Sequence, residues 1–346
     1  TFINILEPHI PDDLIGKEYI ECFREIFREL PLVSHAVLER YFGEGQQRVD
    51  VNVCITGWMN EHATLYNWLE KKGHYHSAEE YSAFERIKQF CKLWSEDYFN
   101  LKLLIAKLWI VYDITDTSNK HIVPWHYVHF NVLPIFSENG SFTGELVFKI
   151  LSLLNQGLHA PWQEKLRDIF TNLPPGFRIS SVGVQESRSV QYLRLYITFT
   201  SFKELFVFLR THHWQGNADE LYAEIETFSE NSNSFGLLAD FGPGLQQRIG
   251  IEVWVNEKND AVKKLIDKGW CTQAQGNAFS AWKGCIKIEN KKEIWSWPDM
   301  ILSSNNFPEH ITIRKLHPYI KIIVEPGKPI MAKGYFTFDR FIMRDE

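Results

Sequence analysis

The stretch that decides the fold is residues 177–200, which read FRISSVGVQESRSVQYLRLYITFT. Its second half alternates between an apolar and a polar face with a period of two, as a half-buried strand does. The apolar face consists of Leu193, Leu195, Ile197 and Phe199. The polar face consists of Tyr192, Arg194, Tyr196 and Thr198. With residues 177–186 as its partner, this strand predicts an antiparallel hairpin.

The same order of helix and hairpin recurs on both sides of this stretch. Helical spacing of apolar residues predicts helices over 161–173 before it and over 202–213 and 217–230 after it. The other predicted hairpins pair residues 33–42 with 48–55, 107–114 with 126–133, 235–241 with 248–255, and 311–325 with 330–338. The remaining predicted helices cover residues 14–30, 60–72, 78–102, 144–156, 257–269 and 272–284.

A hairpin that recurs at regular intervals between helices is typical of a repeat architecture. Helices can cover only one face of such a sheet, and closing the sheet removes its exposed edges. We therefore predict an α+β fold, a closed ten-stranded antiparallel barrel of five hairpins surrounded by helix pairs. No linker or low-complexity tract divides the chain, so residues 1–346 are expected to form a single αββα-repeat barrel domain.

If helices cover the outside of the barrel, the polar strand faces point into its lumen. The basic residues on these faces are Arg48, Arg194, Arg248, Lys321 and Lys333. Tyrosines 192, 196 and 335 alternate with them. Charge in an enclosed space is costly unless it is paired or binds an anion. Pairing with Asp50, Asp113, Glu252 and Glu325 is one interpretation, and a bound diphosphate is the other, because Arg and Lys both bind phosphate oxygens well.

Composition and motifs exclude several functions. The net charge of −6 argues against a nucleic-acid partner, because proteins that bind nucleic acids usually carry a basic surface that contacts the phosphates. Five scattered cysteines without a C-x-x-C pair favour reduced thiols in a cytoplasmic protein, and no membrane span or signal peptide is visible. His121, His126 and His129 lack the spacing of a metal site, so no metal ligand is assigned. Neither a P-loop nor a dinucleotide-binding glycine motif occurs.

The pattern of units resembles the aromatic and peptide prenyltransferases of the ABBA type, whose αββα units form a barrel with the active site in the lumen. The motifs that carry the resemblance are Arg194-Leu-Tyr196 and Lys333-Gly-Tyr335, which are similar to the basic-x-Tyr strands of that family. Arg48, Arg248 and Lys321 occupy similar places in their hairpins. The resemblance covers nearly the whole chain in architecture, but not as a full-length sequence match.

The resemblance implies transfer of an allylic group from an isoprenoid diphosphate to an indole, a phenol or a peptide side chain. The basic residues, with Tyr196 and Tyr335, would hold the diphosphate, and an aromatic lining would stabilise the carbocation. The lining candidates are Tyr192, Trp254 and Trp109. Glu252 and Asp50 are the candidates for the group that orients the acceptor or removes its proton. No cofactor is required, although Asp113 and Asp50 would be able to hold Mg²⁺ through diphosphate oxygens.

Two other functions fit the same pattern. The barrel would also serve as a non-catalytic ligand- or peptide-binding protein of a biosynthetic pathway. An enzyme of another class, such as a hydrolase or transferase acting on a peptide, would use His35, His126 or His129 as its base. The sequence contains no nucleophile elbow for such an enzyme.

Overall fold

A computed structural model describes most of the chain. The residues that it does not describe are 1, 2, 4, 5, 12, 13, 32, 47, 58, 97–100, 102–104, 119–121, 131–151, 153–159, 185–191, 231, 233, 243, 256–259, 289–310, 317, 318 and 343–346. The predicted helix over 144–156 and His121 therefore lie largely or wholly outside the described residues.

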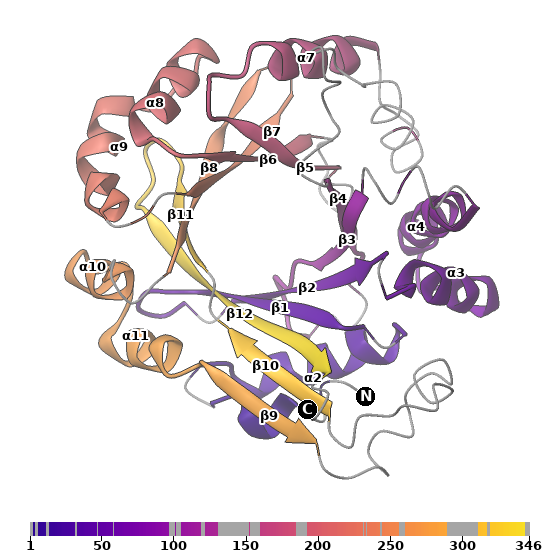
Figure 1. Cartoon of the computed structure of the whole chain (residues 1–346). Helices are drawn as coiled ribbons and strands as arrows, with labels where there is room; N and C mark the ends of the chain where they lie inside the picture. Colours follow the sequence, from indigo (N-terminus) through magenta and orange to yellow (C-terminus); the bar gives the residue numbers. More distant parts are fainter. Residues whose placement is uncertain are drawn as a thin grey trace.

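Ten antiparallel strands close into a barrel, which confirms the predicted fold class (Figure 1). The first eight are β1 (His35–Tyr41), β2 (Val49–Thr56), β3 (Ile105–Tyr112), β4 (Trp125–Phe130), β5 (Arg178–Val184), β6 (Leu193–Phe199), β7 (Phe235–Phe241) and β8 (Leu245–Trp254). The last two are β11 (Tyr319–Val324) and β12 (Met331–Ile342). Each strand pairs with its neighbour, β8 pairs with β11, and β12 returns to pair with β1.

The fifth hairpin differs from its prediction. The strand expected over 311–325 is two strands, β10 (Ile311–Leu316) and β11, and both pair with the long β12. An additional strand, β9 (Gly284–Ile288), which the sequence pattern did not indicate, pairs with β10 outside the barrel. The complete sheet thus has twelve strands, ten of which form the closed wall.

Helices surround the barrel wall in Figure 1. They are α2 (Lys17–Arg28), α3 (Glu61–Lys71), α4 (Ala78–Glu96), α7 (Ala160–Thr171), α8 (Phe202–Thr211), α9 (Ala218–Ile225), α10 (Ala261–Asp267) and α11 (Gln273–Ser280). All eight lie within helices predicted from the sequence, apart from one residue at the start of α7. Within the described part of the chain, none of the helices is long and apolar enough to cross a membrane.

The main core lies between the helices and the outer face of the barrel. The apolar strand residues Val51, Leu195 and Ile251 are completely buried and belong to this core together with side chains of the helices. Their polar neighbours along the strands point inward, as the alternation predicts. The lumen is therefore lined with polar and aromatic side chains, which places chemistry inside the barrel rather than on its surface.

Lys72, between α3 and α4, is an internal cation on the outside of the barrel. Its ammonium lies 5.1–5.4 Å from the ring centroids of Trp68, Tyr75 and Phe84 and pairs with Glu29. Only 5% of its side chain is exposed. Its ammonium also lies 3.8 Å from the buried carboxylate of Glu80. Because three rings and two carboxylates lose their cation together, Lys72→Met should lower the free energy of unfolding by about 2–4 kcal/mol.

Denaturant titration of Lys72→Met tests this expectation, with the exposed neighbour Lys71 changed to Met as the matched control. The control should shift the free energy of unfolding by less than about 0.5 kcal/mol. Equal effects of the two substitutions would show that the aromatic contacts of Lys72 contribute no stability.

Candidate active site

The lumen contains a cavity of about 580 Å³. Nine of the twelve predicted site residues line it: Arg194, Arg248, Glu252, Lys321, Lys333, Tyr196, Tyr335, Trp109 and Trp254. Arg48 and Asp50 lie immediately behind the lining, where they contact its charged residues. Tyr192 is not among the lining residues and lies just before β6, beside Gly242.

Two of the aromatic side chains predicted to line the lumen lie differently from expectation. Strand β6 begins at Leu193, so Tyr192 is outside the regular alternation on which its prediction rested. Trp254 is the last residue of β8, and 42% of it remains exposed, although it touches the cavity and packs edge-on against Tyr319. Trp254 therefore belongs to the rim of the cavity, and Trp109 is an interior residue.

Arg194 and Arg248 lie at one end of the lumen, which we call the arginine end. Two hydrogen bonds to Asp240 hold the Arg194 guanidinium in place. Its Nε and Nη2 donate to the two carboxylate oxygens of Asp240 at 2.7 and 2.8 Å. Its guanidinium also lies 5.2 Å from the ring of Trp125. Burial alone would lower the pKa of Arg194, but the Asp240 carboxylate outweighs it, so the guanidinium remains charged.

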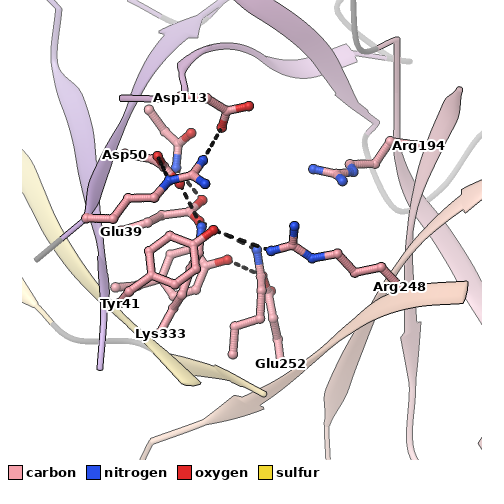
Figure 2. Close-up of polar contacts among 12 residues, drawn as sticks. Glu39, Tyr41, Asp50, Asp113, Arg194, Arg248, Glu252 and Lys333 are labelled. Atoms are coloured by element: carbon pink, nitrogen blue, oxygen red, sulfur yellow. Dashed lines mark hydrogen bonds and ion pairs between the residues drawn. The ribbon is translucent and has the colours of Figure 1, made fainter. Parts of the chain in front are cut away.

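Arg248 is the most available cation at this end. Its Nη2 donates a long hydrogen bond of 3.4 Å to the Tyr41 hydroxyl, and it forms no ion pair with a carboxylate in the described part of the chain. In Figure 2 the guanidinium groups of Arg194 and Arg248 extend from one wall toward the space in front of Tyr41 and Asp113. Two arginine groups that face one space are suited to a ligand with several negative oxygens.

Lys321 and Lys333 are neighbours on β11 and β12, directly opposite each other in the sheet. Like charges in that position repel, and Glu39 lies close to both, 3.7 Å from Lys321 and 3.0 Å from Lys333. Lys333 also donates to Asp50 at 2.7 Å. Lys321 also lies 3.4 Å from Glu252, so each lysine contacts one of the carboxylates that the pairing interpretation named, and Glu39 is an additional partner of both.

Glu39 is a central site residue that the sequence reasoning missed. It lines the cavity from β1 and accepts from Asn52 at 2.6 Å in addition to its lysine contacts. Burial would raise the pKa of Glu39, but Lys321 and Lys333 together hold it well below its usual value. Glu39 is therefore an ionised carboxylate in the middle of the lumen.

Glu252 is the second carboxylate in the middle of the lumen. It contacts one lysine, Lys321, whereas Glu39 contacts two. It accepts a hydrogen bond from the Tyr335 hydroxyl at 2.7 Å and another from Tyr196, and its nearest cation is Lys321 at 3.4 Å. Burial raises the pKa of Glu252, and Lys321 and Tyr335 offset this only in part. A carboxylate with a raised pKa is suited to accept a proton during a reaction.

Aromatic rings occupy the wall between the arginine end and the opposite end of the lumen. Trp109 stacks on Tyr127 with ring centroids 6.0 Å apart, and Tyr319 packs on Tyr335 at 4.2 Å. Tyr127 and Tyr319 were not among the predicted lining candidates, and Tyr127 belongs to the second hairpin, whose strands were not read face by face. Such rings are able to stabilise a cation in a space from which water is excluded.

Tyr196 depends on a glycine of the neighbouring strand for its position. A Cβ atom at Gly236 would lie 2.4–2.7 Å from three atoms of the Tyr196 side chain, so the ring rests directly on the glycine. Gly236→Ala should therefore displace Tyr196 and weaken its hydrogen bond to Glu252. We expect a loss of about 1–3 kcal/mol in the free energy of unfolding.

Gly73→Ala is the matched control for this substitution, because nothing lies within 4 Å of a Cβ atom at that position. Thermal unfolding of both variants tests the expectation. Unchanged stability in Gly236→Ala would mean that Tyr196 moves aside without consequence.

A Mg²⁺ site built on Asp50 and Asp113 does not fit the positions of these residues. Asp50 Oδ1 accepts from Arg48 Nε at 3.0 Å and from the Ile114 amide at 3.2 Å, and its Oδ2 accepts from Lys333. Arg48 Nη2 also lies 3.8 Å from Asp113, so a guanidinium already occupies the place between the two carboxylates. Among the described residues, no cluster of three or more His, Cys, Asp or Glu side chains is placed to hold a metal ion.

The histidines considered as bases for a hydrolase lie on different faces of the barrel wall: His35 and His129 line the cavity, and His126 does not. His126 is completely buried, and its neighbours in the alternation, Tyr127 and Trp125, line the cavity instead. His129 lines the cavity, and its Nδ1 lies 2.7 Å from the Ser181 hydroxyl. Burial and then Lys107 lower the pKa of His129 to about 4, which makes it a poor base for activating Ser181.

Comparison with known proteins shows the fold but no family. No family model matches the sequence, and no curated protein matches it. Among solved structures, the apo form of prenyltransferase PriB matches with a TM-score of 0.51 and 13% identity, over 93% of this chain and 90% of PriB. The ternary complex of PriB with L-tryptophan and dimethylallyl thiolodiphosphate matches with a TM-score of 0.52 and 12% identity, over 99% and 96%. At these identities the chain shares the barrel fold of these prenyltransferases, and its chemistry must be argued from its own residues.

Proposed function

We propose that this protein transfers an allylic prenyl group from an isoprenoid diphosphate to an electron-rich aromatic acceptor inside its lumen. One observation carries the proposal: the cavity in the lumen combines an arginine end, an aromatic middle and a buried carboxylate with a raised pKa. The reaction needs these three groups, because it separates an anion from a carbocation and then releases a proton.

The diphosphate of the donor would bind at the arginine end. Arg248 and the free edge of Arg194 would hold its oxygens, and Arg48, which faces Asp50 and Asp113, would add positive charge nearby. Lys321 and Lys333 are occupied by Glu39, Asp50 and Glu252, so we assign them to the carboxylates rather than to the diphosphate. Tyr335 donates to Glu252 and is likewise assigned to the middle of the lumen.

The chemical step follows from this arrangement. The bond between the allylic carbon and the diphosphate oxygen breaks, the electron pair leaves with the diphosphate, and the aromatic rings stabilise the allylic cation. The π electrons of the acceptor then form the new carbon–carbon bond. Glu252 accepts the proton that the acceptor loses when its aromaticity is restored. Asp50 has both oxygens engaged and is 1% exposed, so we assign this proton to Glu252 alone.

The test is incubation with dimethylallyl or geranyl diphosphate and an indole, phenol or peptide acceptor, followed by mass spectrometry and assay of released diphosphate. The proposal expects a prenylated acceptor and an equal amount of diphosphate. Absence of both products with every donor and acceptor would overturn it.

One observation favours the alternative, a non-catalytic barrel that binds a ligand or peptide. Four of the five basic residues predicted for the diphosphate already contact carboxylates, namely Arg48, Arg194, Lys321 and Lys333. A lumen with balanced charge would hold a neutral ligand. Binding of an indole or peptide with no turnover in the incubation above would support this alternative.

Metal removal provides a further prediction. Because Arg48 occupies the space between Asp50 and Asp113, we expect prenyl transfer to keep at least half of its rate in excess EDTA. Rates measured with EDTA, and with EDTA plus excess Mg²⁺ as the control, test this expectation. A loss of activity that added Mg²⁺ restores would contradict it.

A further inference from the structure

Tyr41 lies where three cations of the lumen meet, although the proposed transfer step uses none of its groups. It is the last residue of β1, lines the cavity and is only 4% exposed. The Lys333 ammonium lies 4.0 Å from the centroid of its ring, and the Arg48 guanidinium lies 5.0 Å from it. Its hydroxyl accepts the 3.4 Å hydrogen bond from Arg248. Tyr41 thus connects cations from separate parts of the wall.

The Tyr41 ring is held in place from its backbone and by two fixed cations. Tyr41 is directly opposite Lys333 in the sheet, and its backbone N–H donates to the carbonyl of Arg48 at 3.0 Å. Both cations are bound to Asp50, Lys333 at 2.7 Å and Arg48 at 3.0 Å. A cation at these distances is attracted to the face of an aromatic ring. The hydroxyl of Tyr41 therefore has a defined position in the lumen.

Arg248 reaches this hydroxyl from another part of the barrel. It belongs to β8, which β11 and β12 separate from β1. Figure 2 shows its guanidinium extending toward the Tyr41 hydroxyl. Arg194 beside it is held by two hydrogen bonds to Asp240, whereas Arg248 contacts no carboxylate among the residues that the structure describes. Fixing a long, flexible side chain before its ligand arrives lowers the entropy that is lost on binding.

A phenol is a suitable partner for an arginine that must remain available to an anion. A carboxylate would neutralise Arg248 and compete with the ligand, whereas the phenol oxygen is an uncharged acceptor. At 3.4 Å the bond is longer than a typical N–H···O bond. It can give way to the shorter, charge-assisted bonds that a guanidinium makes to phosphate oxygens. Tyr41 thus orients Arg248 without occupying it.

We infer that Tyr41 is a positioning residue of the diphosphate site: it holds the Arg248 guanidinium at the arginine end and acts on the diphosphate only through that arginine. This inference rests on the proposed function, because the diphosphate is that of the proposed donor. A residue that acts through Arg248 has no effect of its own once Arg248 is removed, whereas a residue that binds the diphosphate directly keeps its effect.

Calorimetry with inorganic pyrophosphate tests the inference without a transfer reaction. Tyr41→Phe keeps the ring and its two cations but removes the hydroxyl, so we expect about 3–10-fold weaker binding of pyrophosphate. In the Arg248→Met background the same substitution should cause no further loss. Tyr81→Phe, at an exposed tyrosine of α4, is the matched control and should leave the affinity unchanged.

Three results would overturn the inference: no binding of pyrophosphate to the wild-type protein, equal affinity of the wild type and Tyr41→Phe, or an equal loss from Tyr41→Phe with and without Arg248. The last result would mean that Tyr41 contacts the anion itself. If the loss depends on Arg248 as expected but no donor and acceptor react, the proposed transfer fails and the positioning role of Tyr41 stands. If transfer occurs but the two losses add, the positioning role fails and the proposed transfer stands.

Discussion

Replacing Glu252 with glutamine should lower kcat by about 10²–10⁴-fold, because the acceptor loses the group that takes up its proton. The wild-type activity should fall on the acid side at a higher pH than an ordinary glutamate would cause, because burial raises the pKa of Glu252 and the carboxylate must be ionised to act. In Glu252→Gln this acid limb should disappear. Rate measurements from pH 4 to 9 on both proteins test the expectation.

Two controls make the Glu252 result specific. Glu70→Gln, at a largely exposed side chain of α3, should leave kcat unchanged. Glu39→Gln removes the other central carboxylate, which Lys321 and Lys333 hold in its ionised form. A larger loss of kcat in Glu39→Gln than in Glu252→Gln would move the base to Glu39 and contradict the assignment.

Replacing Arg248 with methionine should weaken binding of the donor diphosphate by about 10–100-fold, the effect of one lost hydrogen bond to a charged group. Among the residues that the structure describes, Arg248 pairs with no carboxylate and has a long contact to Tyr41, so the substitution leaves none of these carboxylates unpaired. The free energy of unfolding should therefore change by less than about 0.5 kcal/mol. Calorimetry with dimethylallyl thiolodiphosphate and denaturant titration measure the two effects separately.

Arg194 provides the contrast for Arg248. Arg194→Met leaves Asp240 buried without its partner, which should cost about 3–5 kcal/mol of stability in addition to weaker donor binding. The double variant Arg194→Met with Asp240→Asn should recover most of the stability but not the donor binding. Unchanged affinity for the donor analogue in Arg248→Met would contradict the assignment of the diphosphate to the arginine end.

The fold could be predicted from sequence because its pattern is local and repeated. The alternation in residues 193–199 separates core-facing from lumen-facing side chains without ambiguity, and the structure confirms it. The break between β10 and β11 was missed, because apolar residues occur on both sides of residues 317 and 318. Strand β9 was also missed, since it is only five residues long and its partner β10 lies more than twenty residues further along the chain.

The candidate site was harder to predict, because its charges are balanced across strands that lie far apart in the sequence. Glu39 is followed directly by Arg40, so the strand alone does not show which of the two charges faces inward. In the structure Arg40 points outward and donates to the carbonyl of Leu14. Asp240 was easier to recognise as a partner for a cation in the lumen, because it is the single charged residue of its strand.

The most direct test of the proposed function is a crystal structure of the protein with dimethylallyl thiolodiphosphate and an aromatic acceptor. The proposal predicts the diphosphate within hydrogen-bond distance of Arg194 and Arg248, with the allylic chain among the aromatic rings and the acceptor beside Glu252. A diphosphate bound at Lys107, or bound outside the lumen, would contradict it.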